Sequence, residues 1–166
     1  MSHCDPLLWG TEAPICQLDQ TSREICCLLG ARIRVVVEGL PKLIRPSDYY
    51  PLLLFHVGTN DTATENLDSI KSDYRALGPV VKGMRAQVVF SSILPSRGKG
   101  ARRRALIGQV NNWLQNWCWR PGFGSYDHRT LFTDQCLFGR DGILLTKKGK
   151  AIFTIRMADF IRKDLN

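Results

Sequence analysis

Short apolar runs alternate along this chain with stretches of helical periodicity, and this alternation constrains the fold more than any other feature of the sequence. Ile25–Leu29, Leu52–Val57 and Gln87–Phe90 are typical of buried strands, and each is followed directly by glycine or serine. Apolar residues recur at helical spacing in four segments, residues 31–44, 65–77, 106–117 and 146–161. This pattern predicts a three-layer α/β/α domain with a short parallel sheet. We also expect a short edge strand at Phe123–Tyr126 and an N-cap at Thr146 for the last helix.

The first helical segment fits two patterns. Within residues 31–44, Val35–Val37 is a β-branched run typical of a strand, whereas the apolar spacing from Ile33 to Leu40 is typical of a helix. We predict a helix, because two parallel strands need a crossover between them. We expect the helix to end or kink at Pro41.

The composition indicates a single globular domain over residues 1–166. Hydrophobic residues make up 44% of the chain and charged residues 23%, which is typical of a folded domain. No apolar run is long enough to span a membrane, and the N-terminus has no signal-peptide pattern. We therefore expect a cytoplasmic or nuclear protein that is not secreted. In such a compartment the six cysteines are expected to be buried, reduced thiols rather than structural disulfides.

Glycines and polar residues follow the predicted strands. Gly30 follows the first run, Gly58–Asp61 the second, and Ser91 and Ser92 the third. In parallel sheets, ligands bind beyond the carboxyl ends of the strands, so these positions are the candidates for a site. The alternative for G-T-N-D is a plain turn that caps the following helix.

The segment His56–Asp61 carries the most information, since a strand that runs into G-x-N-D resembles the third block of the SGNH (GDSL-type) hydrolases. By that resemblance, the Asn60 side chain donates to an oxyanion, and the backbone N–H of Gly30 serves the same oxyanion hole. Asp141, in the sequence D-G-I, resembles the start of the final D-x-x-H block, which supplies the triad acid and base. D-G alone is also a common turn dipeptide. The likeness covers nearly the whole chain and implies the family's α/β fold.

Three further segments are similar to one branch of that family. Gly10–Pro14, Arg45–Pro51 and Ala86–Ser92 resemble the esterase-like domain encoded in the first open reading frame of vertebrate LINE-type retrotransposons. The resemblance implies a retrotransposon origin for this domain.

Two positions depart from the family pattern where catalysis needs them. The family's first block is G-D-S, with serine as the nucleophile, but the aligned residues here are Cys4-Asp5-Pro6, so Pro6 holds the nucleophile's place. Leu144 holds the place of the histidine base. Proline has no nucleophilic atom and leucine accepts no proton, so an acyl-enzyme route lacks both groups. We predict a catalytically degenerate domain, and the alternative is a weak serine-type esterase that acts on acyl esters.

The remaining histidines and the N-terminus add no further chemistry. The family strand that precedes the first block has no counterpart before Cys4, so we expect a truncated domain without its first strand. Cys4 adjoins His3, but adjacent residues rarely point at each other. His56 is expected to be a packed core residue and His128 a loop residue. None of these residues has metal-ligand spacing, so neither a metal nor a cofactor is expected.

The densest charge cluster is basic and precedes the third helical segment. It consists of Arg97, Lys99, Arg102, Arg103 and Arg104. A run of charges like this is typical of a solvated loop and helix start, and the alternative is a phosphate-binding patch. With a net charge of +8, RNA or single-stranded DNA would be the partner of such a patch. Trp113, Trp117 and Trp119 follow at a helical spacing that favours a core face over base stacking.

Overall fold

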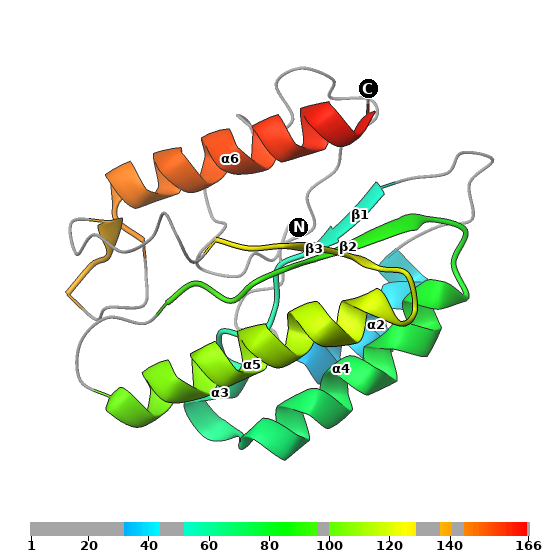
Figure 1. Ribbon diagram of the computed structural model, residues 1–166, viewed down its shortest axis with the longest axis horizontal. Coiled ribbons are helices and arrows are strands. Elements are labelled where there is room, and N and C mark those ends of the chain that lie inside the picture. Colours follow the sequence, from blue (N-terminus) through cyan, green and yellow to red (C-terminus); the bar gives the residue numbers. More distant parts are fainter. Residues whose placement is uncertain (1–31, 44–51, 96–99, 129–136, 141–144, 166) are drawn as a thin grey trace. The chain divides into compact units, whose positions relative to one another are not determined.

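The computed structural model describes residues 32–43, 52–95, 100–128, 137–140 and 145–165 (Figure 1). These residues belong to two compact units. One unit is Ala31–Thr133, and the other combines Met1–Gly30 with Asp134–Asn166. The predicted strand at Ile25–Leu29 lies outside the described residues.

A parallel sheet organises the unit Ala31–Thr133. Its strands are β1 (Leu52–Phe55), β2 (Gln87–Ser91) and β3 (Gly124–Tyr126), in the order β1-β2-β3. Phe90 pairs with Phe55 on one side and with Ser125 on the other, and both ladders are parallel. Each strand lies at a predicted run, with shifted ends. β1 ends at Phe55, two residues before the predicted run does, and β2 extends one residue further, to Ser91. β3 is the predicted edge strand without Phe123. Because the strands are parallel, all three end at the same edge of the sheet.

Four helices of this unit are described. They are α2 (Ile33–Leu43), α3 (Asp61–Thr64), α4 (Leu67–Lys82) and α5 (Ala101–Trp119). α2 confirms the helical interpretation of residues 31–44, and Pro41 lies within its last turn. Asn66 is the N-cap of α4, and its side chain accepts a hydrogen bond of 2.9 Å from the Ser69 N–H. The short helix α3 was not predicted.

The core of this unit is built around an aromatic cluster. The ring of Phe90 on β2 lies 6.0 Å from Tyr74 of α4 and 5.6 Å from Trp117 of α5, measured between centroids. α4 and α5 therefore cover the same face of β2 (Figure 1). Gly78 allows the two helices to approach closely, since a Cβ atom there would lie 2.8 Å from Cζ2 of Trp117. The predicted α/β class with a short parallel sheet is confirmed.

The expectation that Trp119 shares the core face of α5 is wrong. Its side chain is 85% exposed, whereas Trp113 and Trp117 stack on each other with centroids 5.4 Å apart. Trp119 is two residues past Trp117, which places it about 200° further around the helix. The core face of α5 instead continues through Cys118, which is buried as a free thiol, as expected for the cysteines.

The second unit contributes one long described helix, α6 (Lys147–Leu165). The Gly149 N–H donates to Thr146 Oγ1 at 3.2 Å, so the predicted N-cap is confirmed. Phe153 and Met157 are buried, as their helical stripe predicted. Among the described residues, no helix combines the length and apolarity that a membrane span requires.

Candidate functional site at the carboxyl edge of the sheet

The G-T-N-D segment directly follows β1, where the sequence placed it. Gly58 has a φ of +109°, a conformation that favours glycine, and Asn60 is half-buried at the start of α3. The hydroxyl of Tyr74 donates to the Val57 carbonyl at 3.0 Å, which anchors the chain just before the turn. Asn60 is therefore on a loop at the edge where ligands of parallel sheets bind.

Asp61 ties this loop to α2. The side chain is fully buried, and its Oδ2 accepts a hydrogen bond of 3.2 Å from the Ile33 N–H at the start of the helix. A carboxylate at a helix N-terminus satisfies an otherwise unpaired donor there. Burial nevertheless raises the pKa of Asp61 to about 6; the Ile33 hydrogen bond lowers it, and the nearby Asp73 raises it further.

Arg103 holds the same loop from the other side. Its Nη2 donates to the Thr59 carbonyl at 2.8 Å, and its Nε donates to Thr62 Oγ1 at 3.2 Å. Arg103 is thus half-buried against the loop, whereas Arg102 and Arg104 are exposed in the first turn of α5. The structure therefore does not bring all three arginines together as one exposed patch.

A hydrogen-bonded network of two histidines and a serine joins the ends of the three strands. The Ser91 hydroxyl at the end of β2 lies 2.8 Å from Nδ1 of His56 and 2.8 Å from Nε2 of His128. His56 follows β1, and His128 lies two residues after β3. The His128 N–H also donates to Ser92 Oγ at 2.8 Å. The expected burial of His56 is confirmed, and burial lowers its pKa to about 4, so the ring is neutral at neutral pH.

This network contains the side chains of a nucleophilic site, but its serine is not accessible to a substrate. A serine hydroxyl beside an imidazole is the arrangement that activates a nucleophile. Ser91, however, is only 1% exposed. A cavity at this edge, lined by Ser92, Asn111 and Tyr126 among others, has a volume of about 10 Å³, which suits about one water molecule and no ester.

Sequence reasoning treated these three residues separately and missed their combination. Each follows or ends a strand of one parallel sheet, and that shared position was the available signal. His128 was the hardest to place, because β3 is short and has only one side chain of strong strand propensity, Tyr126.

Three carboxylates form a second cluster that the sequence spacing did not predict. Asp61 begins α3, Glu65 directly follows that helix, and Asp73 lies in α4. One oxygen from each of Asp61, Glu65 and Asp73 lies within 4.8 Å of the other two. Burial raises the pKa of Glu65, and a hydrogen bond with Asp73 raises it further. Carboxylate oxygens suit a hard cation such as Mg²⁺ or Ca²⁺. The raised pKa values of Asp61 and Glu65 favour protons on these two carboxylates, and the protons compete with a cation.

Several predicted site residues lie outside the described residues. These are Gly30, Asp141, Arg97 and Lys99, together with the two substituted triad positions, Pro6 and Leu144. Of the predicted oxyanion and acid groups, the structure therefore places only Asn60.

Known structures share this fold at low sequence identity. A GDSL-like lipase from Bacteroides thetaiotaomicron matches with a TM-score of 0.74 at 16% identity, over 94% of this chain and 82% of that chain. A member of the lipolytic protein G-D-S-L family from Veillonella parvula matches with a TM-score of 0.76 at 12% identity, over 91% of this chain and 87% of that chain.

A third structure belongs to a retroelement. The esterase domain of the ORF1 protein from the zebrafish ZfL2-1 retrotransposon matches with a TM-score of 0.54 at 23% identity, over 89% of this chain and 95% of that chain. Neither a protein-family model nor a curated protein sequence matches the chain. The parallel sheet, the G-x-N-D loop at its carboxyl edge and these structural matches together show that the chain has the SGNH (GDSL-type) hydrolase fold.

Proposed function

We propose that this chain is a catalytically degenerate SGNH hydrolase-like domain of retrotransposon origin, with little or no ester hydrolysis. The observation that carries the proposal is the pair of residues at the triad positions, Pro6 for the nucleophile and Leu144 for the base. In a serine protease, loss of such a unit costs on the order of a millionfold in turnover. Asn60 then remains as part of an oxyanion hole without a nucleophile.

The origin is supported by two likenesses. Gly10–Pro14, Arg45–Pro51 and Ala86–Ser92 resemble the esterase-like domain of LINE-type retrotransposons. The match to the zebrafish retrotransposon esterase domain, at 23% identity, supports the same origin. A cytoplasmic or nuclear location fits such an element.

A weak serine-type esterase acting on acyl esters is the second candidate. The Ser91 hydroxyl, 2.8 Å from a ring nitrogen of both His56 and His128, is the observation that favours it. The burial of Ser91 argues against it, because an acyl group must reach the oxygen for a bond to form.

A nucleic-acid-binding accessory module is the third candidate. The net charge of +8 and the exposed side chains of Arg102 and Arg104 favour it, with RNA or single-stranded DNA as the partner.

Hydrolysis of a p-nitrophenyl acyl ester tests the leading proposal. The unmodified protein should turn over the ester no faster than Asn60→Ala, since no acyl-enzyme forms for the amide to stabilise. Neither protein should react with a fluorophosphonate probe. Stoichiometric labelling at any residue would contradict the proposal, and its loss in Ser91→Ala would assign activity to the buried serine.

A further inference from the structure

A groove opens at the end of the sheet opposite the G-T-N-D loop. It lies at the amino ends of β2 and β3, between the loop that follows α4 and the turn that ends α5, and its volume is about 860 Å³. That volume lies within the range of small-molecule binding sites. The groove is therefore large enough for a ligand, unlike the small cavity at the carboxyl edge.

The groove combines positive charge with one exposed indole. Lys82 and Arg85 line it from the α4 side, and both are exposed. Trp119 lines it from the α5 side and is 85% exposed, although tryptophan is usually among the more buried residues. Arg120, next in the chain, is also exposed. Among the described residues that line the groove, none is acidic.

The backbone of Trp119 is fixed before any ligand arrives. Gly122 has a φ of +78°, the left-handed conformation of a helix-ending glycine. The Phe123 N–H donates to the Cys118 carbonyl at 2.9 Å, and the Gly122 N–H donates to the Trp119 carbonyl at 3.3 Å. These two bonds form a Schellman motif, which holds the indole's attachment point in place and lowers the entropy cost of stacking on it.

We propose that this groove binds single-stranded nucleic acid, with a base stacked on Trp119 and backbone phosphates next to Lys82 and Arg85. Proteins that bind single strands without sequence preference combine a basic groove with an aromatic platform in this way. The carboxyl ends of α4 and α5 bring partial negative charge, and the full charges of Lys82, Arg85 and Arg120 outweigh it. A hollow surface suits a flat base better than a lipid bilayer, which receives protruding apolar side chains.

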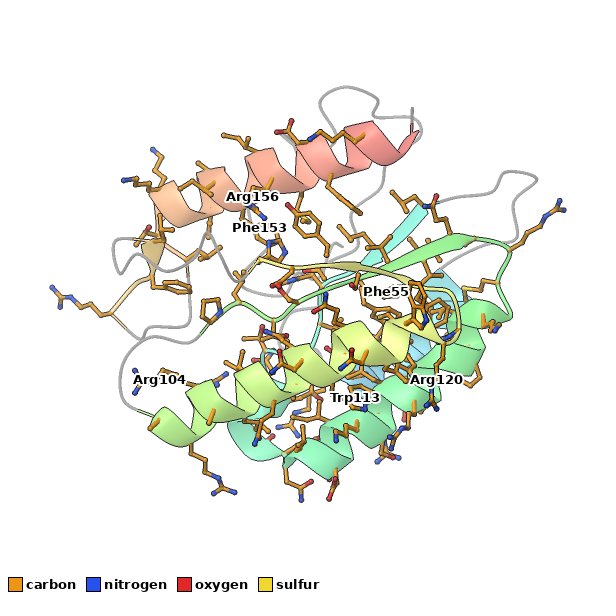
Figure 2. All side chains as sticks on the ribbon, in the orientation of Figure 1. Phe55, Arg104, Trp113, Arg120, Phe153 and Arg156 are labelled. Carbon is orange, nitrogen blue, oxygen red and sulfur yellow. The ribbon has the colours of Figure 1, made fainter. Side chains whose placement is uncertain are left out.

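The proposal does not depend on hydrolysis, and its site differs from the basic cluster noted in the sequence. Figure 2 shows Arg104 at one end of α5 and Arg120 at the other. The two candidate nucleic-acid sites are therefore separated by the length of that helix and can be tested against each other.

Fluorescence anisotropy with labelled oligo(dT) and oligo(U), titrated at several salt concentrations, tests the proposal. Trp119→Ala should weaken binding by about 5- to 150-fold, and Trp119→Phe should retain most of the affinity. Affinity falls as salt rises, and each phosphate contact on a single strand adds about 0.7 to the steepness of log affinity against log salt. Lys82→Ala with Arg85→Ala should therefore make that slope shallower by about 1.4.

The matched control is Arg102→Ala with Arg104→Ala, which removes the same charge at the other end of α5 and should leave the slope unchanged. The proposal is overturned if Trp119→Ala binds both oligonucleotides like the unmodified chain. If only the control pair makes the salt dependence shallower, the proposal is overturned in favour of the basic cluster. Binding to anionic vesicles that Trp119→Ala abolishes, with no effect on oligonucleotides, overturns it in favour of a membrane surface.

Discussion

Two glycines with positive φ show how much a single residue decides in this fold. Gly58, with a φ of +109°, begins the loop that presents Asn60. A Cβ atom at Gly58 would lie 2.7 Å from Cδ1 of Ile93 and 2.8 Å from the Tyr74 hydroxyl oxygen. Gly122 has a φ of +78°, but no heavy atom of the described residues lies within 4 Å of its Cβ position. The two positions share a backbone requirement and differ in crowding.

Gly58→Ala should therefore destabilise the domain more than Gly122→Ala. We expect a loss of about 2–4 kcal/mol in the free energy of unfolding at Gly58, from backbone strain together with overpacking. At Gly122 we expect about 1–2 kcal/mol, from backbone strain alone. Urea unfolding measures both values, and equal losses would show that the contacts around Gly58 adapt to a methyl group.

At the scale of elements, α5 both covers the sheet and fastens the loop after β1. Arg103 in its first turn donates to Thr59 and Thr62, while Arg104 points to solvent. Positive charge at a helix N-terminus is unfavourable to the helix itself. Arg103 offsets this cost through its hydrogen bonds, and Arg104 makes no such contact with the loop.

Arg103→Ala should lower the free energy of unfolding by about 1–2 kcal/mol. This value is in the lower part of the range for hydrogen bonds from charged groups, because the half-buried side chain is partly screened by solvent. Arg104→Ala should change it by no more than about 0.5 kcal/mol. Thermal melts of the two variants check this, with faster amide exchange over residues 59–62 expected only in Arg103→Ala. Identical melts would show that the loop is held without Arg103.

Most elements could be predicted because their signals are local. The apolar runs at β1 and β2 and the helical stripes of α4 and α5 each occupy one short window of sequence, and hydrophobic periodicity reports such windows directly. α3 escaped prediction because four residues contain barely one helical turn. The network around Ser91 escaped because its members are 35 and 37 residues apart along the chain and meet only when the sheet forms.

For the whole molecule, two buried groups couple stability to pH in opposite directions. The pKa of His56 is lowered from 6.5 to about 4, and the pKa of Asp61 is raised from 3.8 to about 6. As the pH falls from 6.5 toward 4, the unfolded chain protonates His56 before the folded chain does, so the folded state loses stability. As the pH falls from 6 toward 3.8, the folded chain protonates Asp61 first, so the folded state gains stability. Each effect is worth about 3 kcal/mol, and they largely cancel.

Single substitutions should expose each effect. Between about pH 6 and about pH 4, Asp61→Asn should lose stability faster than the unmodified chain as the pH falls, since only the His56 effect remains. His56→Asn should lose stability more slowly, or gain it. Urea unfolding across this pH range gives the slope of the unfolding free energy against pH for each variant. A substitution that lowers the unfolding free energy equally at every pH leaves this slope unchanged. Three parallel profiles would show that neither group is coupled to folding.

The several contacts of the G-T-N-D loop have a consequence for how this segment changes over generations. Gly58 provides a backbone turn that fits between Ile93 and Tyr74, and the Asp61 carboxylate accepts from the N-terminus of α2. Under the proposed function, selection for folding alone would preserve Gly58 and Asp61 among descendants of this domain. A conserved G-x-x-D in a relative is therefore not by itself a sign of an active esterase, since these two residues are kept by the contacts that hold the loop in the fold.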